Sequence, residues 1–389
     1  MLSEAYDTVI IGGGPVGMAL ALALHDSGIS TLLLEARGLP EKDEDPRPLA
    51  LSHGSRLILQ RLGVWPELSN ATPITTIHIS NQGSLGRTVL TSEDAGVPAL
   101  GYVVNYHDLF KAMHQLLQVT KVDYLSGAQV TKFETNTEQG QVEFQYGKKD
   151  RKVAAKLLVL ADGGRLTGQI ENINYQVHEY QQWAIVANIK AEMPQSGIAY
   201  ERFTPDGPVA LLPTGDDFSL VWTVSPLMAQ EILAQDDEVF LSRLHQHFGD
   251  RLGKFIKAGK RSGFPLLLKY ATSNTSQRIA LVGNAAQTLH PVAGQGFNLG
   301  LRDAWELASV ILTTDVTTEI GTPAMLSRFH QKRQVDSNSG RIFTDSLVKL
   351  FSNDNILLKN ICGIGLSALD TLPPLKRFVA RRMIFGARG

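Results

Sequence analysis

Cysteine and net charge are both scarce in this sequence. The chain of 389 residues holds one cysteine, Cys362, which excludes an internal disulfide framework and a cysteine-based zinc or iron–sulfur site. So little cysteine fits a reducing compartment, and we expect a cytoplasmic protein without a metal. The formal net charge of -1 offers no general electrostatic attraction to nucleic acid, so we expect no such partner.

Long hydrophobic runs are also missing. The best candidate, residues 8–25, carries no Lys, Arg, Asp or Glu, but Gly12-Gly13-Gly14-Pro15 interrupts it and no basic residue precedes it. This pattern is typical of neither a signal peptide nor a membrane span. Hydrophobic residues make up 43% and charged residues 19%, as in an ordinary globular protein, and the length allows two or three packed units.

The N-terminal segment carries a nucleotide-binding pattern. Residues 7–11 predict a strand, Gly12-x-Gly14-x-x-Gly17 follows, residues 18–26 predict a helix, and residues 31–34 predict a strand that ends at Glu35. The glycines permit a tight turn and the close approach of a pyrophosphate, and an acid about 20 residues further on can hold a ribose hydroxyl. Because all parts agree, we predict dinucleotide binding. The motif alone does not choose between NAD and FAD.

A second glycine-rich segment lies between an apolar strand at 279–282 and a helical pattern at 304–312. It contains Asn284, Gly294, Gln295, Gly296 and Asn298. The two glycines permit the backbone to approach a flat ligand. A helix that starts near Asn298 would direct unpaired N–H groups and the positive end of its dipole at that ligand. The segment predicts a site for a planar, anionic ligand; a surface turn before a helix is the alternative.

The remaining patterns predict a second domain and a helical end. Residues 74–80 and 87–90 predict a hairpin, 122–154 predict short antiparallel strands, and 157–160 predict a buried strand that ends at Asp162-Gly163. Residues 183–224 predict strands rich in β-branched and aromatic residues, the best candidate for a separate β-sheet domain. Residues 325–350 and parts of 355–385 show helical spacing.

Three landmarks stand in one order along the chain: Gly12-x-Gly14-x-x-Gly17 with Glu35, Asp162-Gly163, and Gly283-Asn284 with Pro291-x-x-Gly294-Gln295-Gly296-x-Asn298. Together they resemble the class A FAD-dependent aromatic hydroxylases related to para-hydroxybenzoate hydroxylase, over essentially the whole chain. Glu201-Arg202-Phe203 and the run from Gly283 to Pro291 resemble the ubiquinone-biosynthesis branch of that family. Asn284 stands where the broad family prefers Asp, and this branch shares the Asn.

The resemblance implies an α/β fold. It would combine a Rossmann-like FAD-binding domain of the para-hydroxybenzoate hydroxylase type with an inserted β-sheet substrate domain and a helical C-terminal region. The FAD-binding parts would be 1–73, 101–180 and 273–320. The substrate domain would be 74–100 and 181–272, and the helical region 321–389.

The resemblance also implies site residues. FAD would be held by Gly12, Gly14, Pro15, Val16, Gly17, Glu35, Ala36, Arg47, Val130, Asp162, Gly283, Asn284, Pro291, Gly294, Gln295, Gly296, Phe297 and Asn298. The substrate pocket would include Phe203, Leu212 and Trp222, for which core packing is an equally good explanation. No catalytic residue is assigned.

The implied reaction hydroxylates 2-polyprenyl-6-methoxyphenol to the 1,4-benzoquinol, with NAD(P)H as a transient electron donor and O₂ as the oxygen source. The alternatives are a sister ring hydroxylase of the same pathway, an FAD-dependent reductase or halogenase, and a non-catalytic flavin-binding subunit. The Trp-x-Trp-x-Ile pattern of halogenases is absent.

A substrate that resides in the membrane suggests that the C-terminal segment lies at the membrane surface. The basic, apolar segment 361–388 predicts peripheral contact with the inner face of the membrane, and packing on the FAD domain is the alternative. Other ubiquinone-biosynthesis proteins are expected partners.

Overall fold

The computed structural model of the chain describes residues 2–38, 48–83, 86–290, 294–314, 320–351 and 356–388. Its first sheet has eight strands, and the parallel ones run in the order β19-β11-β1-β2-β8. The strands are β1 (Ala5–Ile11), β2 (Thr31–Glu35), β8 (Asp123–Ser126), β9 (Ala128–Thr135), β10 (Gly140–Tyr146), β11 (Lys149–Leu160), β18 (Thr275–Ser276) and β19 (Ile279–Leu281). Parallel strands are buried on both faces, which explains the apolar runs at 9–11 and 157–160.

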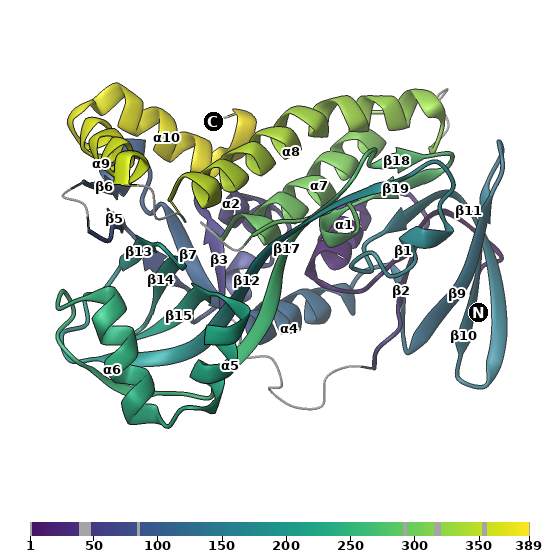
Figure 1. The fold of residues 1–389 in the computed structure, drawn as a ribbon. Helices are drawn as coiled ribbons and strands as arrows, with labels where there is room; N and C mark the ends of the chain where they lie inside the picture. The colour runs from purple at the N-terminus through teal and green to yellow at the C-terminus, as the bar shows by residue number, and fades with distance from the viewer. Residues whose placement is uncertain are drawn as a thin grey trace.

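Helices cover one face of this sheet and a hairpin covers the other. The helices are α1 (Pro15–Leu24), α4 (Tyr106–Leu117) and α7 (Gln295–Leu312). Their apolar sides share a core with Ile10, Leu33 and Val159. On the opposite face, β9 and β10 pack Phe133 and Phe144 against the sheet. This Rossmann-like lobe contains the N-terminus and lies on the right of Figure 1.

Two details of the sequence analysis are wrong here. The strand expected to be antiparallel at 122–125 is β8, which pairs with β2 in the parallel direction. It follows helix α4, and a helical crossover lets the next strand run parallel to its neighbour. The strands expected at 152–154 and 157–160 are one strand, β11, whose first half pairs with β10 and whose second half joins β1.

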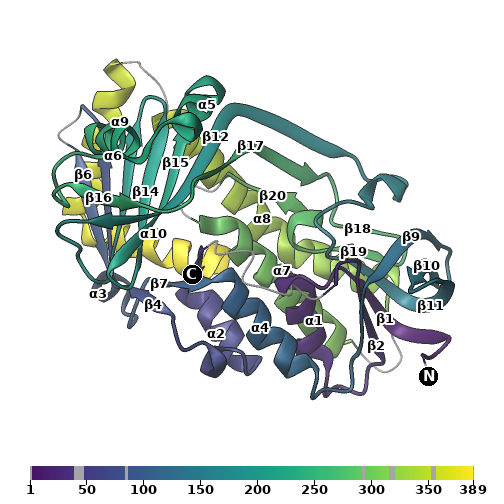
Figure 2. The ribbon, with the colours of Figure 1, turned by 90° about the horizontal axis from the view of Figure 1, so that it is seen from below.

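The second sheet has nine strands and forms the other lobe. Its main path is β20-β17-β12-β15-β14-β13-β5-β6, and β16 pairs with β12. The strands are β5 (Thr76–Asn81), β6 (Arg87–Thr91), β12 (Tyr175–Ala191), β13 (Ile198–Thr204), β14 (Gly207–Thr214), β15 (Asp217–Val224), β16 (Phe255–Ala258), β17 (Ser262–Ala271) and β20 (Gln287–Thr288). The hairpin 76–91 therefore joins the same sheet as the strands of 175–224. Figure 2 shows β12 and β17 running from this sheet toward the Rossmann-like lobe.

Smaller elements fill the junction between the lobes. A three-stranded sheet contains β3 (Pro48–Ser52), β4 (Thr72–Ile74) and β7 (Gly101–Asn105). Helices α5 (Pro226–Ala234) and α6 (Asp237–Phe248) pack on the outer face of the nine-stranded sheet. The short helices are α2 (His53–Arg61), η1 (Trp65–Glu67), α3 (Ser92–Ala95), η2 (Thr167–Gln169), η3 (Gly283–Ala285) and η5 (Gly386–Arg388).

The C-terminal helices bridge the two lobes. Helix α8 (Pro323–Phe351) packs on α7, α9 (Ile356–Thr371) packs on β5 and β6, and α10 (Pro373–Phe385) packs on α2 and α3. Figure 1 shows them along the upper side, with α9 and α10 above the β-sheet lobe. In the part of the chain that the structure describes, no helix combines the length and apolarity that a membrane span requires.

A buried ion cluster begins at Asp303 on α7. Its Oδ2 accepts a hydrogen bond from the Gly283 backbone N–H at 3.0 Å, and its Oδ1 accepts one from Arg333 Nε on α8 at 2.7 Å. The two side chains are 3% and 4% exposed, so each charge depends on the other. This contact holds the start of the second glycine-rich segment against α7 and α8.

Asp336 extends the cluster to the end of the chain. Its Oδ2 accepts hydrogen bonds from Arg333 Nη1 at 2.7 Å and from Arg302 Nε at 2.8 Å. Its Oδ1 accepts one from the Ala387 backbone N–H at 2.9 Å. Burial alone raises the pKa of Asp336, but the Arg302 and Arg333 guanidinium groups outweigh it and lower that pKa to about 2.

The Asp336→Asn variant should lose about 2 to 3 kcal/mol of unfolding free energy at pH 7. A carboxyl whose pKa is 3.8 in the unfolded chain and about 2 in the folded protein stabilises the fold above about pH 4. That contribution is lost as the pH falls toward 2. Urea denaturation at several pH values should therefore show a difference from wild type that is full at pH 7 and shrinks below pH 4.

Asp26→Asn is the matched control, because the Asp26 side chain is 86% exposed beside His25. It should change the unfolding free energy by less than about 0.5 kcal/mol. An equal loss in both variants, or a loss in Asp336→Asn that does not depend on pH, would contradict the role of the cluster.

Candidate active site

A cavity of about 1120 Å³ lies where the Rossmann-like lobe, the nine-stranded sheet and the C-terminal helices meet. Its lining includes fifteen residues of the predicted site: Gly12, Gly14, Pro15, Val16, Glu35, Asp162, Phe203, Leu212, Gly283, Asn284, Gly294, Gln295, Gly296, Phe297 and Asn298. These residues come from segments far apart in the sequence. The fold therefore brings both glycine-rich segments and part of the sheet to one space.

The three glycines of the first motif have different surroundings. A Cβ at Gly12 would lie 2.4 Å from the Ala161 backbone oxygen, and a Cβ at Gly17 would lie 2.0 Å from the Gly12 backbone oxygen. These two positions need glycine so that β1, α1 and the end of β11 can pack closely. A Cβ at Gly14 would meet no described atom within 4 Å, although Gly14 lines the cavity. The space beside Gly14 is thus open to a ligand.

Glu35 closes β2 at the edge of the cavity. Its Oε2 accepts a hydrogen bond from the Gly13 backbone N–H at 2.7 Å. Its Oε1 accepts bonds from the Arg37 backbone N–H at 2.9 Å and from Arg37 Nε at 3.1 Å. These contacts fix the carboxylate beside the glycine turn, where a carboxylate can also accept a bond from a ribose hydroxyl.

A smaller cavity of about 180 Å³ shares Gly12 and Asp162 with the large one. Ala36 and Val130, two further predicted residues, line it. The Asp162 carboxylate accepts hydrogen bonds from the backbone N–H groups of Gly164 at 2.9 Å and Leu166 at 2.8 Å. It therefore shapes the turn after β11, whose residue Asp162 lines both cavities.

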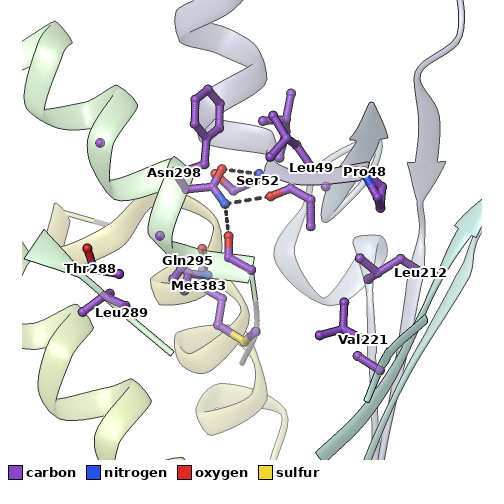
Figure 3. Close-up of a pocket in the computed structure, with 18 of the residues that line it drawn as sticks. Pro48, Leu49, Ser52, Leu212, Val221, Thr288, Leu289, Gln295, Asn298 and Met383 are labelled. Carbon is purple, nitrogen blue, oxygen red and sulfur yellow. Dashed lines mark hydrogen bonds between the residues drawn. The ribbon is translucent and has the colours of Figure 1, made fainter. Parts of the chain in front are cut away.

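Helix α7 begins at the cavity wall. Its N-cap, Gly294, has a left-handed conformation with φ of +59°, which glycine adopts without strain. Asn298 clasps this turn: its Oδ1 accepts a bond from the Ser52 N–H at 2.8 Å, and its Nδ2 donates to the Ala50 oxygen at 2.9 Å and the Gly294 oxygen at 2.7 Å (Figure 3). Asn298 thus positions the wall by tying α7 to β3, a role that the sequence analysis did not foresee.

Gly14 at the start of α1 and Gly294 and Gly296 at the start of α7 form a cradle in the cavity wall. Its chemistry fits a flat, anionic ligand. Gly294 caps α7 and Gly14 caps α1, and neither helix has an acidic residue in its first turn within the described chain. Both helix starts line the cavity, so their N–H groups and positive dipole ends favour negative charge there. A Cβ at Gly296 would also meet no described atom within 4 Å, as at Gly14. Both glycines therefore leave room for FAD.

Two predicted residues, Gly17 and Trp222, lie away from the cavities, and two others are not among the described residues. Gly17 is at the contact between α1 and β1 rather than at the cavity surface. Trp222 lies on the outer face of the nine-stranded sheet, 0% exposed, in the core with Phe240 and α6. Alternation along β15 places its neighbour Val221 at the cavity instead. Arg47 and Pro291 lie outside the described residues.

Glu201 is a cavity residue to which the sequence analysis assigned no role. Glu201 on β13 lines the cavity among apolar side chains, and its Oε1 is buried without a hydrogen-bond partner among the described residues. Burial raises the pKa of Glu201 to about 7. Its sequence signal is a carboxyl between Ala199 and Phe203 on the apolar side of an alternating strand.

The far part of the cavity is apolar. Helices α8, α9 and α10 contribute Leu347, Leu366, Leu369, Val379, Ala380, Met383 and Ile384. Figure 3 shows Leu212 and Val221 on the sheet across the cavity from Gln295 and Met383. The cavity therefore continues from the polar cradle into an apolar extension.

Comparisons with known proteins agree with this geometry. A family described as an FAD binding domain matches residues 5–338. The ubiquinone hydroxylase UbiL of Rhodospirillum rubrum is 33% identical, over 97% of this chain and 89% of its own. The 3-demethoxyubiquinol 3-hydroxylase of Escherichia coli is 29% identical, over 97% of this chain and 98% of its own. The solved structure of p-nitrophenol 4-monooxygenase PnpA from Pseudomonas putida has a TM-score of 0.81 at 16% identity, over 100% of both chains.

The family match covers most of the chain. It confirms the predicted resemblance to FAD-dependent aromatic hydroxylases, the predicted fold class and FAD as the cofactor, with NAD(P)H as the electron donor typical of these enzymes. The chain belongs to this family of FAD-binding proteins and is an FAD-dependent aromatic hydroxylase.

Proposed function

We propose that this protein hydroxylates the ring of a polyprenylated phenol in ubiquinone biosynthesis, with 2-polyprenyl-6-methoxyphenol as the substrate and its 1,4-benzoquinol as the product. The observation that carries the proposal is one cavity in which the glycine cradle continues into an apolar extension under α8, α9 and α10. The relatives named as ubiquinone hydroxylases support the pathway. An aromatic ring with a prenyl chain has the matching shape and polarity.

For the cofactor, we propose that the pyrophosphate lies beside Gly14 at the start of α1. The adenosine ribose would lie near Glu35, and the adenine in the small cavity beside Ala36 and Val130. The flavin ring would lie along 294–298. When bound, FAD supplies the redox chemistry by which NAD(P)H and O₂ deliver one oxygen atom to the ring.

The chain's own residues then orient the phenol and exclude water. The apolar sheet face and the C-terminal helices enclose the ring, and a dry cavity strengthens every remaining polar contact. The phenolic oxygen donates electron density to its ortho and para carbons. Because the prenyl and methoxy groups occupy the ortho carbons, the para carbon is the open position.

Gly14→Val should lower FAD affinity by at least about 100-fold, or about 3 kcal/mol. The new side chain would project into the cavity where the pyrophosphate approaches, while the fold should stay intact because no described atom lies within 4 Å of the added Cβ. FAD binding can be measured by quenching of flavin fluorescence, and folding by circular dichroism. The control is Gly168→Val, an exposed position outside both cavities with equally open space. Equal FAD affinity in the two variants would refute this placement of the cofactor.

Labelled oxygen tests the reaction directly. FAD-loaded protein, NAD(P)H, ¹⁸O₂ and a 2-prenyl-6-methoxyphenol with a short chain should give a product with one ¹⁸O atom at the carbon para to the hydroxyl, detected by mass spectrometry. Label at another ring carbon would make the protein a sister hydroxylase of the pathway. NAD(P)H oxidation with no label in any phenol would contradict ring hydroxylation.

We also propose that the surface of α9 and α10 contacts the membrane that holds the substrate. Both helices are packed on the body of the protein through Leu366, Ala380 and Ile384. They nevertheless expose Ile364, Leu375 and Phe378, as well as Leu372 between them, and Arg377 and Arg381 are also exposed. Apolar and cationic side chains together suit an anionic lipid surface.

The Arg377→Glu/Arg381→Glu variant should bind vesicles of phosphatidylglycerol and phosphatidylethanolamine at least about tenfold more weakly, since each basic residue contributes about 1 kcal/mol at such a surface. Arg382 is unsuitable for this test because it donates to the Ala387 oxygen at 2.6 Å and to Ser339 Oγ at 2.9 Å. Vesicle flotation is the measurement. Lys148→Glu/Lys149→Glu, the same charge change on the exposed β10–β11 turn, is the control. Equal flotation of both variants would remove α9 and α10 from the proposal.

A further inference from the structure

A row of side chains crosses the nine-stranded sheet on its cavity face. Strand register places Ile79 beside Glu201, Glu201 beside Ala210, Ala210 beside Val221, and Val221 beside Val186. All five line the cavity. Because the other four are aliphatic, Glu201 is the single ionisable group in this row.

The carboxyl of Glu201 has no partner within the described chain. Its buried Oε1 accepts no hydrogen bond from the described residues. Its neighbour Arg202 faces the other side of the sheet, where its Nε donates to the His247 oxygen at 3.0 Å. A buried acceptor without a partner is unfavourable, so a ligand that donates a hydrogen bond here would gain affinity.

The other titratable groups described around the cavity either have partners of their own or lie toward the proposed cofactor site. Tyr200 shares β13, but its hydroxyl donates to Gln195 Oε1 at 2.7 Å, and its ring stacks on His78 of β5. On the covering helices, Asp345 accepts a bond from Tyr180 Oη at 3.1 Å, and Asp370 accepts one from the Val89 N–H at 3.0 Å. Among the described residues that line the cavity, the remaining titratable side chains lie toward the proposed cofactor site: Glu35, Arg37, Tyr106, Asp162 and Arg165.

We propose that Glu201 binds the phenolic hydroxyl of the substrate and accepts its proton, an inference that rests on the proposed ring hydroxylation. Phe203, two residues further along the same face of β13, packs with Leu366 of α9 and Leu347 of α8. Glu201 is therefore next to the apolar enclosure that would hold the prenyl chain. A ring bound with its hydroxyl on Glu201 would extend its ortho prenyl group along that enclosure.

The proton step balances. The phenolic O–H bond breaks, the proton moves to the Glu201 carboxylate, and the electron pair stays on the phenolic oxygen. That pair enriches the para carbon, which bonds one atom of O₂. The two electrons and one proton from NAD(P)H, with one proton from solvent, reduce the other atom to water. The para carbon then releases its hydrogen as a proton to water, the new oxygen takes up one proton from water, and Glu201 returns its proton to the phenolic oxygen. The product is a hydroquinone, and the carboxylate is restored.

The protonation state of Glu201 suits this role. Burial raises its pKa to about 7, so the carboxylate form predominates above that pH and the acid form below it. A base with a pKa near the working pH combines availability with proton affinity. The rate of hydroxylation should therefore fall as the pH drops below 7.

The test compares Glu201→Gln with wild type, using FAD-loaded protein, NAD(P)H, O₂ and the short-chain 2-prenyl-6-methoxyphenol. Gln keeps the size and can accept a hydrogen bond but takes no proton, so kcat for product should fall about 100-fold. KM should change little, and NAD(P)H oxidation should continue with the oxygen appearing as hydrogen peroxide. The acid limb of the pH profile should be absent. Glu143→Gln, the same change on β10 outside the cavity, is the control.

A binding experiment provides a readout without turnover. Oxidised wild-type protein should bind the phenol about tenfold more tightly than its methyl ether, which has no proton to donate, because one hydrogen bond to a charged group is lost. Glu201→Leu should bind the two ligands alike. Thermal unfolding at pH 8 checks the fold, and both variants should be at least as stable as wild type, because each removes a carboxylate whose buried Oε1 has no partner in the described chain.

The outcomes separate this inference from the proposed function. Unchanged kcat, coupling and pH profile in Glu201→Gln would overturn the role of Glu201 and leave ring hydroxylation in place. A wild type that hydroxylates no phenol would refute the proposed function. In that case, equal preference for the phenol in wild type and Glu201→Leu would also overturn the contact at Glu201.

Discussion

The contact between Asp303 and Gly283 holds the cofactor side of the cavity together. The Asp303 carboxylate, buried in α7, accepts the N–H of Gly283, two residues after the end of β19, and Arg333 of α8 compensates its charge. Removing one member of such a buried pair costs about 3 to 5 kcal/mol, because the other charge stays desolvated. Close packing reinforces the contact: a Cβ at Gly300 would lie 3.0 Å from Gly283 Cα and 3.0 Å from Val16 Cγ2. The two glycine-rich segments therefore meet at one fixed spacing, and the wall of the cavity depends on it.

The opposite wall of the cavity, formed by the nine-stranded sheet, depends on the alternation of side chains along its strands. In a strand, successive side chains face opposite sides of the sheet. A shift of one residue in the pairing register would therefore move every side chain that faces the cavity to the other side. In β15, Val221 faces the cavity and Trp222 faces α6. In β13, Ala199, Glu201 and Phe203 face the cavity, while Tyr200 packs in the outer core. The same register that buries Trp222 thus places a carboxyl in an otherwise apolar wall.

Features encoded by neighbouring residues could be predicted from the sequence. The first motif depends on residues close together in the chain, so its strand, glycine turn, helix and Glu35 could be recognised directly. The family resemblance proposed Phe203 and Leu212 for the substrate pocket, and both side chains line the cavity. The resemblance also proposed Trp222, but in β15 it is the neighbouring Val221 that lines the cavity, because successive side chains of a strand face opposite sides.

Long-range pairing could not be derived in this way. Asn298 bonds to Ser52 across 246 positions, and nothing near either residue in the sequence identifies the other. The pairing of β8 with β2 depends on the path through α4, and the fusion of two expected strands into β11 depends on neighbours from both sides. Asp303, Arg333 and Asp336 likewise show their roles only when α7 and α8 pack together.

A buried polar atom without a hydrogen-bond partner indicates a functional site only when its surroundings leave room for a ligand. Trp222 Nε1 is buried without a hydrogen-bond partner among the described residues, as is Glu201 Oε1. The indole lies in a packed core that no ligand enters, so its missing bond is a modest loss of stability offset by a large apolar ring. The carboxyl lies on a cavity wall and carries a charge that the sheet does not neutralise. Natural chains break local rules mainly at functional sites, and Glu201 does so where a substrate ring can supply the missing partner.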